Sequence, residues 1–203
     1  MIVYDFYSGT GSSTQAFKDA GHTVIKIELD EYFEADERDI LTLTADILIS
    51  KYGQPHFIWA SPPCTSFSVA SIGHHWTEDK KPKTTQALES LELVEFTLNL
   101  IKALKPAAWL MENPRGMLRK QEIMKGLTHR QITYCSYGDT RMKPTDLWGD
   151  VPNWIARSAC KNGDSCHEAA PRGSRTGTQG LKGAKTRSMV PYQLSEELLN
   201  VLS

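Results

Sequence analysis

The stretch Asp5-Phe6-Tyr7-Ser8-Gly9-Thr10-Gly11-Ser12 decides the fold. It begins in an apolar segment, residues 2–6, that predicts a short buried strand, and residues 13–20 after it predict a helix that ends at Gly21. A strand that runs into Gly-x-Gly and then into a helix lets the backbone approach a nucleotide-like ligand closely. An ordinary Gly-rich turn is the alternative interpretation. The third glycine of the dinucleotide-binding pattern is absent, which argues against a pyrophosphate ligand.

Strand and helix patterns alternate along the rest of the chain. Further strands are predicted at residues 23–28, 56–60, 107–111 and 130–136. Helices are predicted at residues 41–51, 86–105, 117–127 and 192–202, and the clearest of them is 86–105. Residues 65–85 and 141–187 lack periodicity and predict loops. This alternation implies parallel β-α-β units, and therefore an α/β fold whose ligands bind at the carboxyl ends of the strands.

The composition excludes several classes of protein. The chain has 203 residues, of which 40% are hydrophobic and 23% charged, with a formal net charge of -1. This length suits one sizeable core, and the charge excludes a uniformly basic nucleic-acid coat and an acidic disordered tail. No apolar run reaches the roughly 18 residues of a membrane span. Four cysteines and the lack of a visible signal peptide predict a reducing, cytoplasmic location.

The near-neutral total hides a basic segment. Residues 141–187 contain nine Lys or Arg residues but only four Asp or Glu residues, whereas the rest of the chain is acidic. A basic segment within a neutral protein suits a localised binding site for a polyanion. A solvated Gly-rich loop is the alternative interpretation.

Two reactive side chains follow predicted strands. Cys64 comes after Ser61-Pro62-Pro63 at the end of strand 56–60, and Glu112 follows strand 107–111. Neighbouring parallel strands would bring both to one edge of the sheet, where a thiolate can attack and an acid can protonate or hydrogen-bond the substrate. Glu28, after strand 23–28, can accept hydrogen bonds from ribose hydroxyls. Inert packing of the cysteine and a surface role for Glu28 are the alternatives.

In their order along the chain, these motifs resemble those of the DNA cytosine-5 methyltransferases, which use S-adenosylmethionine. Phe6-x-x-Gly9-x-Gly11 resembles the cofactor loop, and Pro63-Cys64 followed by Ser66-Phe67-Ser68 resembles the nucleophile loop. Glu112-Asn113 resembles the Glu-Asn-Val element, and Tyr137-Gly138-x-x-Arg141-x-Lys143 resembles a later motif. Ser188-Met189-Val190-Pro191 resembles the last motif, which returns to the cofactor site.

The resemblance implies a Rossmann-like class I S-adenosylmethionine-dependent methyltransferase fold with a mostly parallel sheet and a minimal target-recognition insert. The catalytic core would comprise residues 1–143 and 188–203, and residues 144–187 would form a small basic region that contacts DNA. The implied catalytic residues are Cys64, Glu112, Arg141 and Lys143. The implied cofactor-binding residues are Phe6, Ser8, Gly9, Gly11, Ser12, Glu28, Asp39, Asp46, Pro62 and Ser188, with Asp39 and Asp46 as competing matches for the acid that reads adenine.

The implied reaction is methyl transfer to C5 of cytosine in DNA. The Cys64 thiolate would add to C6 while Glu112 contacts the ring, and a cytosine in a duplex would first be flipped out of the stack. The loop 65–85, with its three lysines, is a candidate to close over the flipped base. Ser66 and the basic residues Arg172, Arg175, Lys182 and Lys185, with Gln179, are candidate DNA contacts.

Departures from the family pattern leave alternatives open. Ser61-Pro62-Pro63 resembles the signature of methyltransferases that act on exocyclic amines, either N4 of cytosine or N6 of adenine. A non-catalytic DNA-binding protein with this fold is the third alternative. Family members are typically longer, so the chain resembles a small phage- or prophage-type member, and a partner subunit is a candidate for target recognition.

A zinc site is a further candidate. Cys160, Cys166 and His167 offer three ligands within eight residues, and Cys135 or another histidine would be the fourth. Unpaired surface cysteines are the alternative interpretation.

Overall fold

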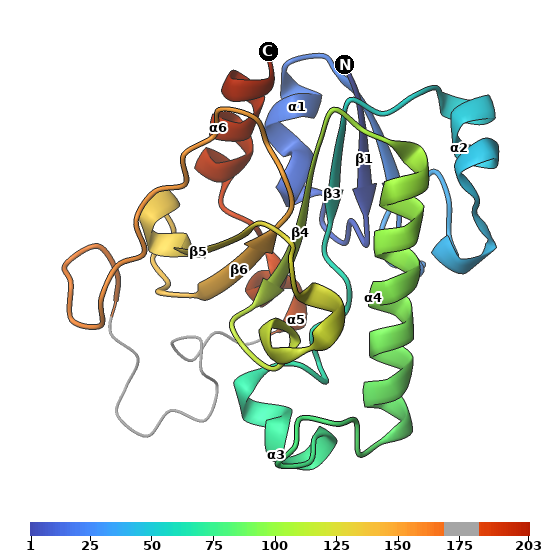
Figure 1. Ribbon diagram of the computed structural model, residues 1–203. Helices are drawn as coiled ribbons and strands as arrows, with labels where there is room; N and C mark the ends of the chain where they lie inside the picture. Colours follow the sequence, from blue (N-terminus) through green and yellow to red (C-terminus); the bar gives the residue numbers. More distant parts are fainter. Residues whose placement is uncertain (169–182) are drawn as a thin grey trace.

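The computed structural model describes residues 1–168 and 183–203 and contains one central sheet (Figure 1). Within the described residues the strand order is β2-β1-β3-β4-β6-β5. Strands β1 to β4 run parallel, whereas β6 is antiparallel to both of its neighbours. The predicted α/β fold with a mostly parallel sheet is therefore confirmed. The strands are β1 Ile2–Phe6, β2 Thr23–Ile27, β3 Phe57–Ala60, β4 Ala108–Pro114, β5 His129–Thr133 and β6 Pro144–Trp148.

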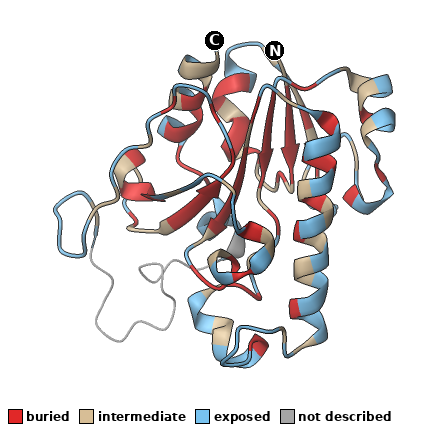
Figure 2. Ribbon diagram, viewed as in Figure 1, coloured by how far each residue is buried: buried red, intermediate tan, exposed pale blue. Residues whose placement is uncertain are grey.

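Helices cover both faces of the sheet (Figure 1). They are α1 Gln15–Asp19, α2 Ala45–Tyr52, α3 Ile72–His75, α4 Thr85–Leu104, α5 Ala184–Ser188 and α6 Tyr192–Leu202. Alternate residues of a strand pack into opposite cores, because successive side chains point to opposite faces. In β3, Ile58 packs on the α2–α4 side and Trp59 on the α1–α6 side, and both are fully buried. The central strands are accordingly buried along their length (Figure 2). No helix of the described residues is both long enough and apolar enough to cross a membrane.

Three segments differ from their sequence predictions. The segment 117–127, expected to be a helix, forms two separate 3-10 turns, at Leu118–Lys120 and Glu122–Met124. The loop expected at 65–85 contains α3, and its Trp76 is buried against Phe67 with the ring centroids 5.7 Å apart. Burial of this one aromatic side chain orders a segment whose polar composition predicts a loop.

The third difference is strand β6, which lies where a loop was expected and which belongs to the sheet rather than to the basic region proposed for residues 144–187. Strand β6 is difficult to recognise in the sequence because a charged residue, Asp146, interrupts its apolar pattern. Asp146 is nevertheless fully buried. Arg119 donates a hydrogen bond of 2.8 Å from Nε to Asp146, and Nε2 of His129 lies 3.1 Å from the same carboxylate. Pairing with β6 also lengthens β4, which continues through Glu112 to Pro114 instead of ending at residue 111.

A buried carboxyl group fixes the exit of β1. Asp5 is fully buried and accepts hydrogen bonds of 2.9–3.0 Å from Ser13 Oγ and 2.7 Å from Thr14 Oγ1. These two hydroxyls belong to the turn Ser12–Thr14 that follows the Gly-rich stretch, so the bonds close the loop between β1 and α1. Burial raises the pKa of Asp5 from 3.8 to about 6, although the two hydroxyl groups act in the opposite direction.

The raised pKa gives the fold a testable dependence on pH. Because the folded state binds the Asp5 proton more tightly than the unfolded chain, the stability contributed by this group is fully present below about pH 4 and falls as pH rises through 6. The side chain introduced by Asp5→Asn cannot ionise. The variant should therefore lack about 3 kcal/mol of the decline in the free energy of unfolding. Urea unfolding at several pH values between 4 and 7 measures it.

Asp79→Asn, at an exposed aspartate, is the control and should follow the wild-type profile. If the Asp5→Asn variant also declined like the wild type between pH 4 and 6, the carboxyl group of Asp5 would not carry the effect.

Candidate active site

The register of the parallel strands aligns β1, β3 and β4. Phe6 pairs with Ala60, and Ala60 pairs with Met111, so β1 and β3 end at one level and β4 continues beyond it through Glu112 to Pro114. The chain runs outward from β1 to β2 and then returns to β3 on the other side of β1. The crevice at this change of direction is where open α/β sheets bind ligands.

The Gly-rich loop beyond β1 has a conformation that requires glycine. Gly9 and Gly11 have positive φ angles of 47° and 72°, and a Cβ added to Gly9 would meet nothing within 4 Å. Glu28, at the end of β2, accepts hydrogen bonds from the N–H of Gly9 at 2.7 Å and from the N–H of Asp30 at 3.0 Å. The side-chain oxygen of Ser8 is buried and has no hydrogen-bond partner. The loop therefore combines open space beside Gly9, an oriented carboxylate and one buried hydroxyl without a partner.

The last segment of the chain returns to this loop. The N–H of Val190 donates to Ser12 Oγ at 2.9 Å, and the N–H of Ala16 donates to Ser195 Oγ of α6 at 3.2 Å. Ser188 itself is exposed, and its hydroxyl donates to the carbonyl of Lys185. The contact between the two motifs thus comes from Val190 rather than from Ser188.

The two candidate adenine-reading acids lie in different settings. Asp39 caps the 3-10 turn Ile40–Thr42 by accepting from the N–H of Leu41 at 3.0 Å. Burial raises the pKa of Tyr7, in the Gly-rich loop, and the negative charge of Asp39 raises it further. Asp46 lies exposed in the first turn of α2. The structure therefore brings Asp39, but not Asp46, close enough to act electrostatically on the loop.

The loop that carries Cys64 is held from the neighbouring strand. Asn113, at the end of β4, donates from Nδ2 to the carbonyl of Pro62 at 3.0 Å. The carbonyl of Cys64 accepts hydrogen bonds from the N–H groups of Phe67 and Ser68, both at 3.0 Å. These bonds form a tight turn immediately after Cys64, so that its side chain occupies a fixed position beyond β3.

A second set of contacts holds the far side of the same turn. Trp76 donates from Nε1 to the carbonyl of Ser66 at 2.7 Å, and the N–H of Met117 donates to the carbonyl of Phe67 at 2.8 Å. Ser66, a predicted DNA contact, is fully buried, and its hydroxyl has no hydrogen-bond partner. Gly116 lies so close that a Cβ on it would be 2.1 Å from the Phe67 carbonyl oxygen. No pattern in the sequence predicts this close approach.

Glu112 is buried beside a cation and a phenol. Its side chain is 9% exposed, and Oε1 accepts a hydrogen bond of 3.0 Å from the hydroxyl of Tyr134. The ammonium of Lys143 lies 3.6 Å from the same oxygen and 4.5 Å from the centre of the Tyr134 ring. Lys143 was expected near the site, whereas Tyr134, at the end of the predicted strand 130–136, carried no signal.

The charges around Cys64 determine its protonation. Burial raises the pKa of the Cys64 thiol, and the negative charge of Glu112 raises it further. The positive charges of Lys143 and Arg187 act in the opposite direction but do not cancel the rise. Cys64 is therefore a thiol at neutral pH, and its deprotonation must be coupled to a ligand or a base.

Arg141 braces the segment that precedes Val190. Its guanidinium donates to Asp139 through Nε at 2.8 Å, to the carbonyl of Thr186 at 2.9 Å and to the carbonyl of Met189 at 3.2 Å. Its side chain is only 6% exposed, and each of the three nitrogens has a partner within the protein. Within the described residues the guanidinium thus bonds to protein groups, and the catalytic function expected of Arg141 stays a prediction.

The remaining predicted residues are distributed as follows. Lys185 is exposed, and its ammonium lies 5.0 Å from the centre of the Tyr32 ring. The ligand atoms of Cys160, Cys166 and His167 lie together with that of Cys135. The other candidate DNA contacts lie outside the described residues, namely Arg172, Arg175, Gln179 and Lys182.

Comparisons with known proteins give relatives and a fold. Residues 1–133 match the family of C-5 cytosine-specific DNA methylases. A probable DNA (cytosine-5)-methyltransferase of frog virus 3 is 28% identical over 219 residues, which cover 99% of this chain and 100% of the viral protein.

Two solved structures resemble the chain. One is a putative DNA modification methyltransferase encoded within an E. coli prophage, with a TM-score of 0.53 and 19% identity over 73% of this chain and 46% of that one. The other is the Entamoeba histolytica methyltransferase EhMeth, with a TM-score of 0.53 and 12% identity over 79% of this chain and 57% of that one. The matches span about half of each solved chain, and at these identities they show the α/β methyltransferase fold alone.

The close approach of Gly116 to Phe67 predicts the effect of adding one methyl group. Gly116→Ala should push the turn that carries Cys64 away from β4, because the added carbon would overlap a backbone oxygen. We expect a loss of about 1–3 kcal/mol in the free energy of unfolding and a changed rate of Cys64 alkylation by iodoacetamide. Urea unfolding and peptide mass spectrometry measure the two effects.

Gly73→Ala is the matched control, since Gly73 has no positive φ angle and an added Cβ there meets no atom within 4 Å. Identical stability and alkylation rates for the two variants would contradict the close approach.

Proposed function

The chain belongs to the family of C-5 cytosine-specific DNA methylases, and on that premise we propose that it transfers a methyl group from S-adenosylmethionine to C5 of cytosine in DNA. One observation carries the proposal: a thiol beyond the end of β3 and a buried carboxylate within the adjacent strand β4 act electrostatically on each other. A nucleophile beside an acid at a strand edge is the arrangement that covalent activation of a ring requires.

The proposed reaction assigns one function to each of these two groups. The deprotonated Sγ of Cys64 adds to C6 of the cytosine. Glu112, in its protonated form, donates a hydrogen bond to N3 and accepts one from the exocyclic amine of the ring. The electron pair displaced by this addition makes C5 nucleophilic, and C5 takes the methyl group. A base then removes the proton from C5, and the bond between Sγ and C6 breaks to release the methylated base.

Lys143 and Arg187 supply the positive charge that this sequence of steps needs. Their charges favour the thiolate of Cys64, whereas the charge of Glu112 opposes it. When Glu112 takes a proton from solvent and donates it in a hydrogen bond to N3 of the bound ring, its negative charge no longer opposes the thiolate. The thiol is then activated chiefly when a substrate is present, which limits unproductive modification of Cys64.

S-adenosylmethionine, when bound, supplies an electrophilic methyl group. Phe6 at the end of β1, Gly9 and Gly11 in the loop beyond it, and Glu28 after β2 would hold it, with Asp39 at the adenine end. Three observations support this fit: the open space beside Gly9, the Glu28 carboxylate fixed by two N–H groups, and the unpartnered hydroxyl of Ser8. Ser12 would shape the loop through its bond to Val190 rather than through the ligand.

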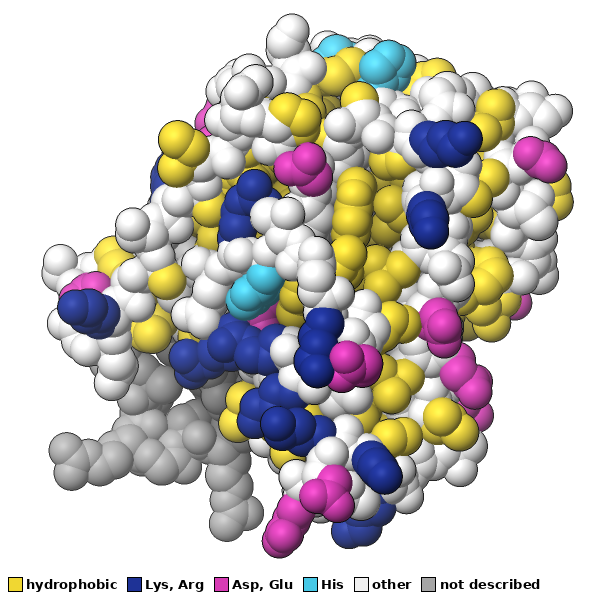
Figure 3. All heavy atoms as spheres, viewed as in Figure 1, with side chains coloured by type: hydrophobic (Ala, Val, Ile, Leu, Met, Phe, Trp, Pro, Cys, Tyr) yellow, Lys and Arg dark blue, Asp and Glu magenta, His cyan; other side chains and the backbone are white. Residues whose placement is uncertain are grey.

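Basic side chains near this edge support a DNA substrate. Arg115 and Lys120 are exposed on the segment that follows β4, and Lys80 is exposed on the segment before α4. Gln121 links the two segments by donating from Nε2 to the carbonyl of Lys80 at 3.3 Å. Figure 3 shows Lys and Arg side chains gathered in the lower part of this face. Neutralising phosphates with such residues supplies most of the affinity for DNA.

Covalent trapping tests the proposal directly. DNA of mixed sequence that contains 5-fluorocytosine carries fluorine where the departing proton would be, so the wild-type protein with S-adenosylmethionine should form an adduct that survives denaturation. Cys64→Ser should form none while still binding S-adenosylmethionine, and DNA with ordinary cytosine is the control. An absent wild-type adduct would support a non-catalytic protein, and a product identified by mass spectrometry as N4-methylcytosine or N6-methyladenine would establish an exocyclic-amine enzyme.

Glu112→Gln should separate two effects of one carboxylate. Loss of its negative charge should lower the pKa of Cys64, so that alkylation of this thiol begins at lower pH than in the wild type. Methyl transfer should nevertheless fall by about 10² or more, because the amide cannot share a proton with the ring. The readouts are the pH profile of Cys64 alkylation and the transfer of labelled methyl groups to DNA.

Glu122→Gln is the control, since the Glu122 side chain is 84% exposed and pairs with Lys125. An alkylation profile that stays at its wild-type position in Glu112→Gln would remove Glu112 from the neighbourhood of the thiol.

A further inference from the structure

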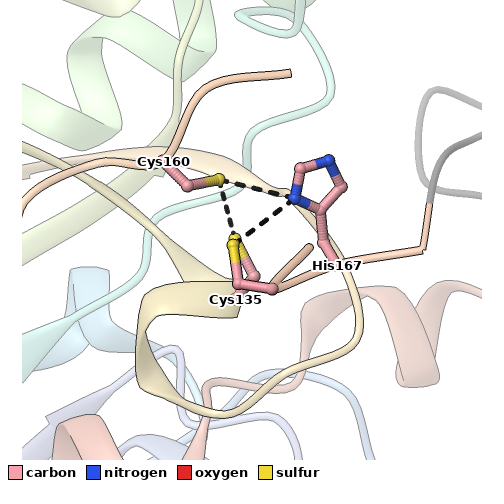
Figure 4. A group of neighbouring side chains, drawn as sticks. Cys135, Cys160 and His167 are labelled. Carbon is pink, nitrogen blue, oxygen red and sulfur yellow. Dashed lines mark hydrogen bonds between the residues drawn. The ribbon is translucent and has the colours of Figure 1, made fainter. Parts of the chain in front are cut away.

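Three cysteines and one histidine meet at the edge of the sheet beside β5. Cys135 lies in the 3-10 turn Tyr134–Tyr137 after β5, Cys160 follows β6 by eleven residues, and Cys166 and His167 are adjacent. One ligand atom from each of the four side chains lies within 4.8 Å of all the others. Figure 4 shows Cys135, Cys160 and His167 pointing toward one another. Three separate segments of the chain therefore direct soft donor atoms at one point.

Two of the three distances between ligand atoms match a tetrahedral metal site, and the third, between two sulfur atoms, is shorter than the roughly 3.8 Å of such a site. Nδ1 of His167 lies 3.6 Å from Sγ of Cys160 and 3.6 Å from Sγ of Cys166. In a tetrahedral zinc site, bond lengths of 2.3 Å to sulfur and 2.0–2.1 Å to nitrogen separate these atoms by about 3.6 Å. The sulfur atoms of Cys135 and Cys160 are 3.0 Å apart, which is longer than a disulfide bond of about 2.05 Å.

Hydrogen bonds that involve no sulfur hold the ligands in place. The N–H of Cys160 donates to Thr133 Oγ1 at 2.9 Å, next to Cys135 in the sequence. Ser136 donates from its hydroxyl to the carbonyl of Ser158 at 2.9 Å, and the N–H of Glu168 donates to the carbonyl of Thr140 at 2.9 Å. The approach of residues 158–168 to residues 133–140 is thus built into the backbone, and the ligand geometry follows from it.

We propose that Cys135, Cys160, Cys166 and His167 bind one Zn²⁺ ion in a closed S₃N site. Thiolate and imidazole donors in tetrahedral geometry favour zinc over harder cations, which prefer oxygen ligands. Four protein ligands leave no open position, so the ion is structural and takes no part in the methyl transfer. The proposal itself does not depend on the proposed function.

The position of the site indicates what the ion does. It joins the segment that ends at residue 168 to the turn after β5, and the described chain resumes at residue 183. Arg141, six residues beyond Cys135, holds the carbonyls of Thr186 and Met189. Described residues on both sides of 169–182, the part of the sequence with candidate DNA contacts, thereby contact residues 133–141. This consequence for DNA binding rests on the proposed function.

Metal analysis of the full-length chain tests the site. Protein freed of any histidine tag should contain one zinc per chain by mass spectrometry. His167→Ala and Cys160→Ser should lower metal retention about tenfold or more. Cys64→Ser and His74→Ala are the matched controls, since both lie outside the cluster, and should keep the metal. Replacing zinc by Co²⁺ should give the intense visible bands of a tetrahedral thiolate site, which His167→Ala should weaken.

A count of free thiols in the wild-type protein tests the site even if a variant fails to fold. Wild-type protein denatured with a chelator and without reductant should expose four free thiols. Two free thiols with a Cys135–Cys160 disulfide, or four thiols without bound metal, would overturn the proposal. Weaker DNA binding in His167→Ala with unchanged S-adenosylmethionine binding supports the structural function. Bound zinc with unchanged DNA affinity would keep the site and overturn its link to DNA.

Discussion

The register of three parallel strands is the constraint on which the rest of the structure depends. Phe6, Ala60 and Met111 lie side by side, so the loops that follow β1 and β3 leave the sheet at the level where β4 presents Glu112. A shift of one residue in β4 would turn Glu112 to the opposite face, because side chains alternate along a strand. Two side chains keep the loops in place. Asp5 accepts the hydrogen bonds that close the loop after β1, and Asn113 donates to the carbonyl of Pro62 in the loop after β3. The geometry of the candidate active site is thus a property of the sheet rather than of its loops.

The charged side chains at this edge of the sheet are stabilised by a series of contacts that extends to the last segment of the sequence. A buried carboxylate such as Glu112 is costly without partners, and Lys143 and Tyr134 supply them. Lys143 in turn contacts the carbonyl of Arg187, which Arg141 also approaches, and the same segment continues to Val190 and its bond to the Gly-rich loop. Removing the last twenty residues would therefore affect the acid and the cofactor loop together, although neither is close to them in the sequence.

Elements and site residues that follow a local sequence pattern could be predicted. Those that depend on contacts between distant segments could not. Strands β1 to β3 and helices α4 and α6 follow from apolar periodicity, and Cys64, Glu112 and the Gly-rich loop follow from their positions at strand ends. Strand β6 was missed because Asp146, buried with Arg119, breaks the apolar pattern of the strand. Gly116 carried no signal because its requirement arises from a backbone 49 positions away, at Phe67. Arg141 was assigned to catalysis by motif position, whereas its partners lie in residues 186–189.

A zinc ion at this site would help a short chain to hold a segment in place for contact with DNA. Residues 149–187 number fewer than 40, a length at which an apolar core alone rarely holds a fold and metals or disulfides usually contribute. A metal ion replaces that core, because four short-range bonds fix a segment that has few large apolar side chains to bury. The entropy cost of holding a loop grows with the length between its fixed points, and the cluster together with Arg141 shortens that length to the residues between 167 and 186. The same turn after β5 supplies Tyr134 to Glu112, so that the proposed zinc site and the buried carboxylate share one support.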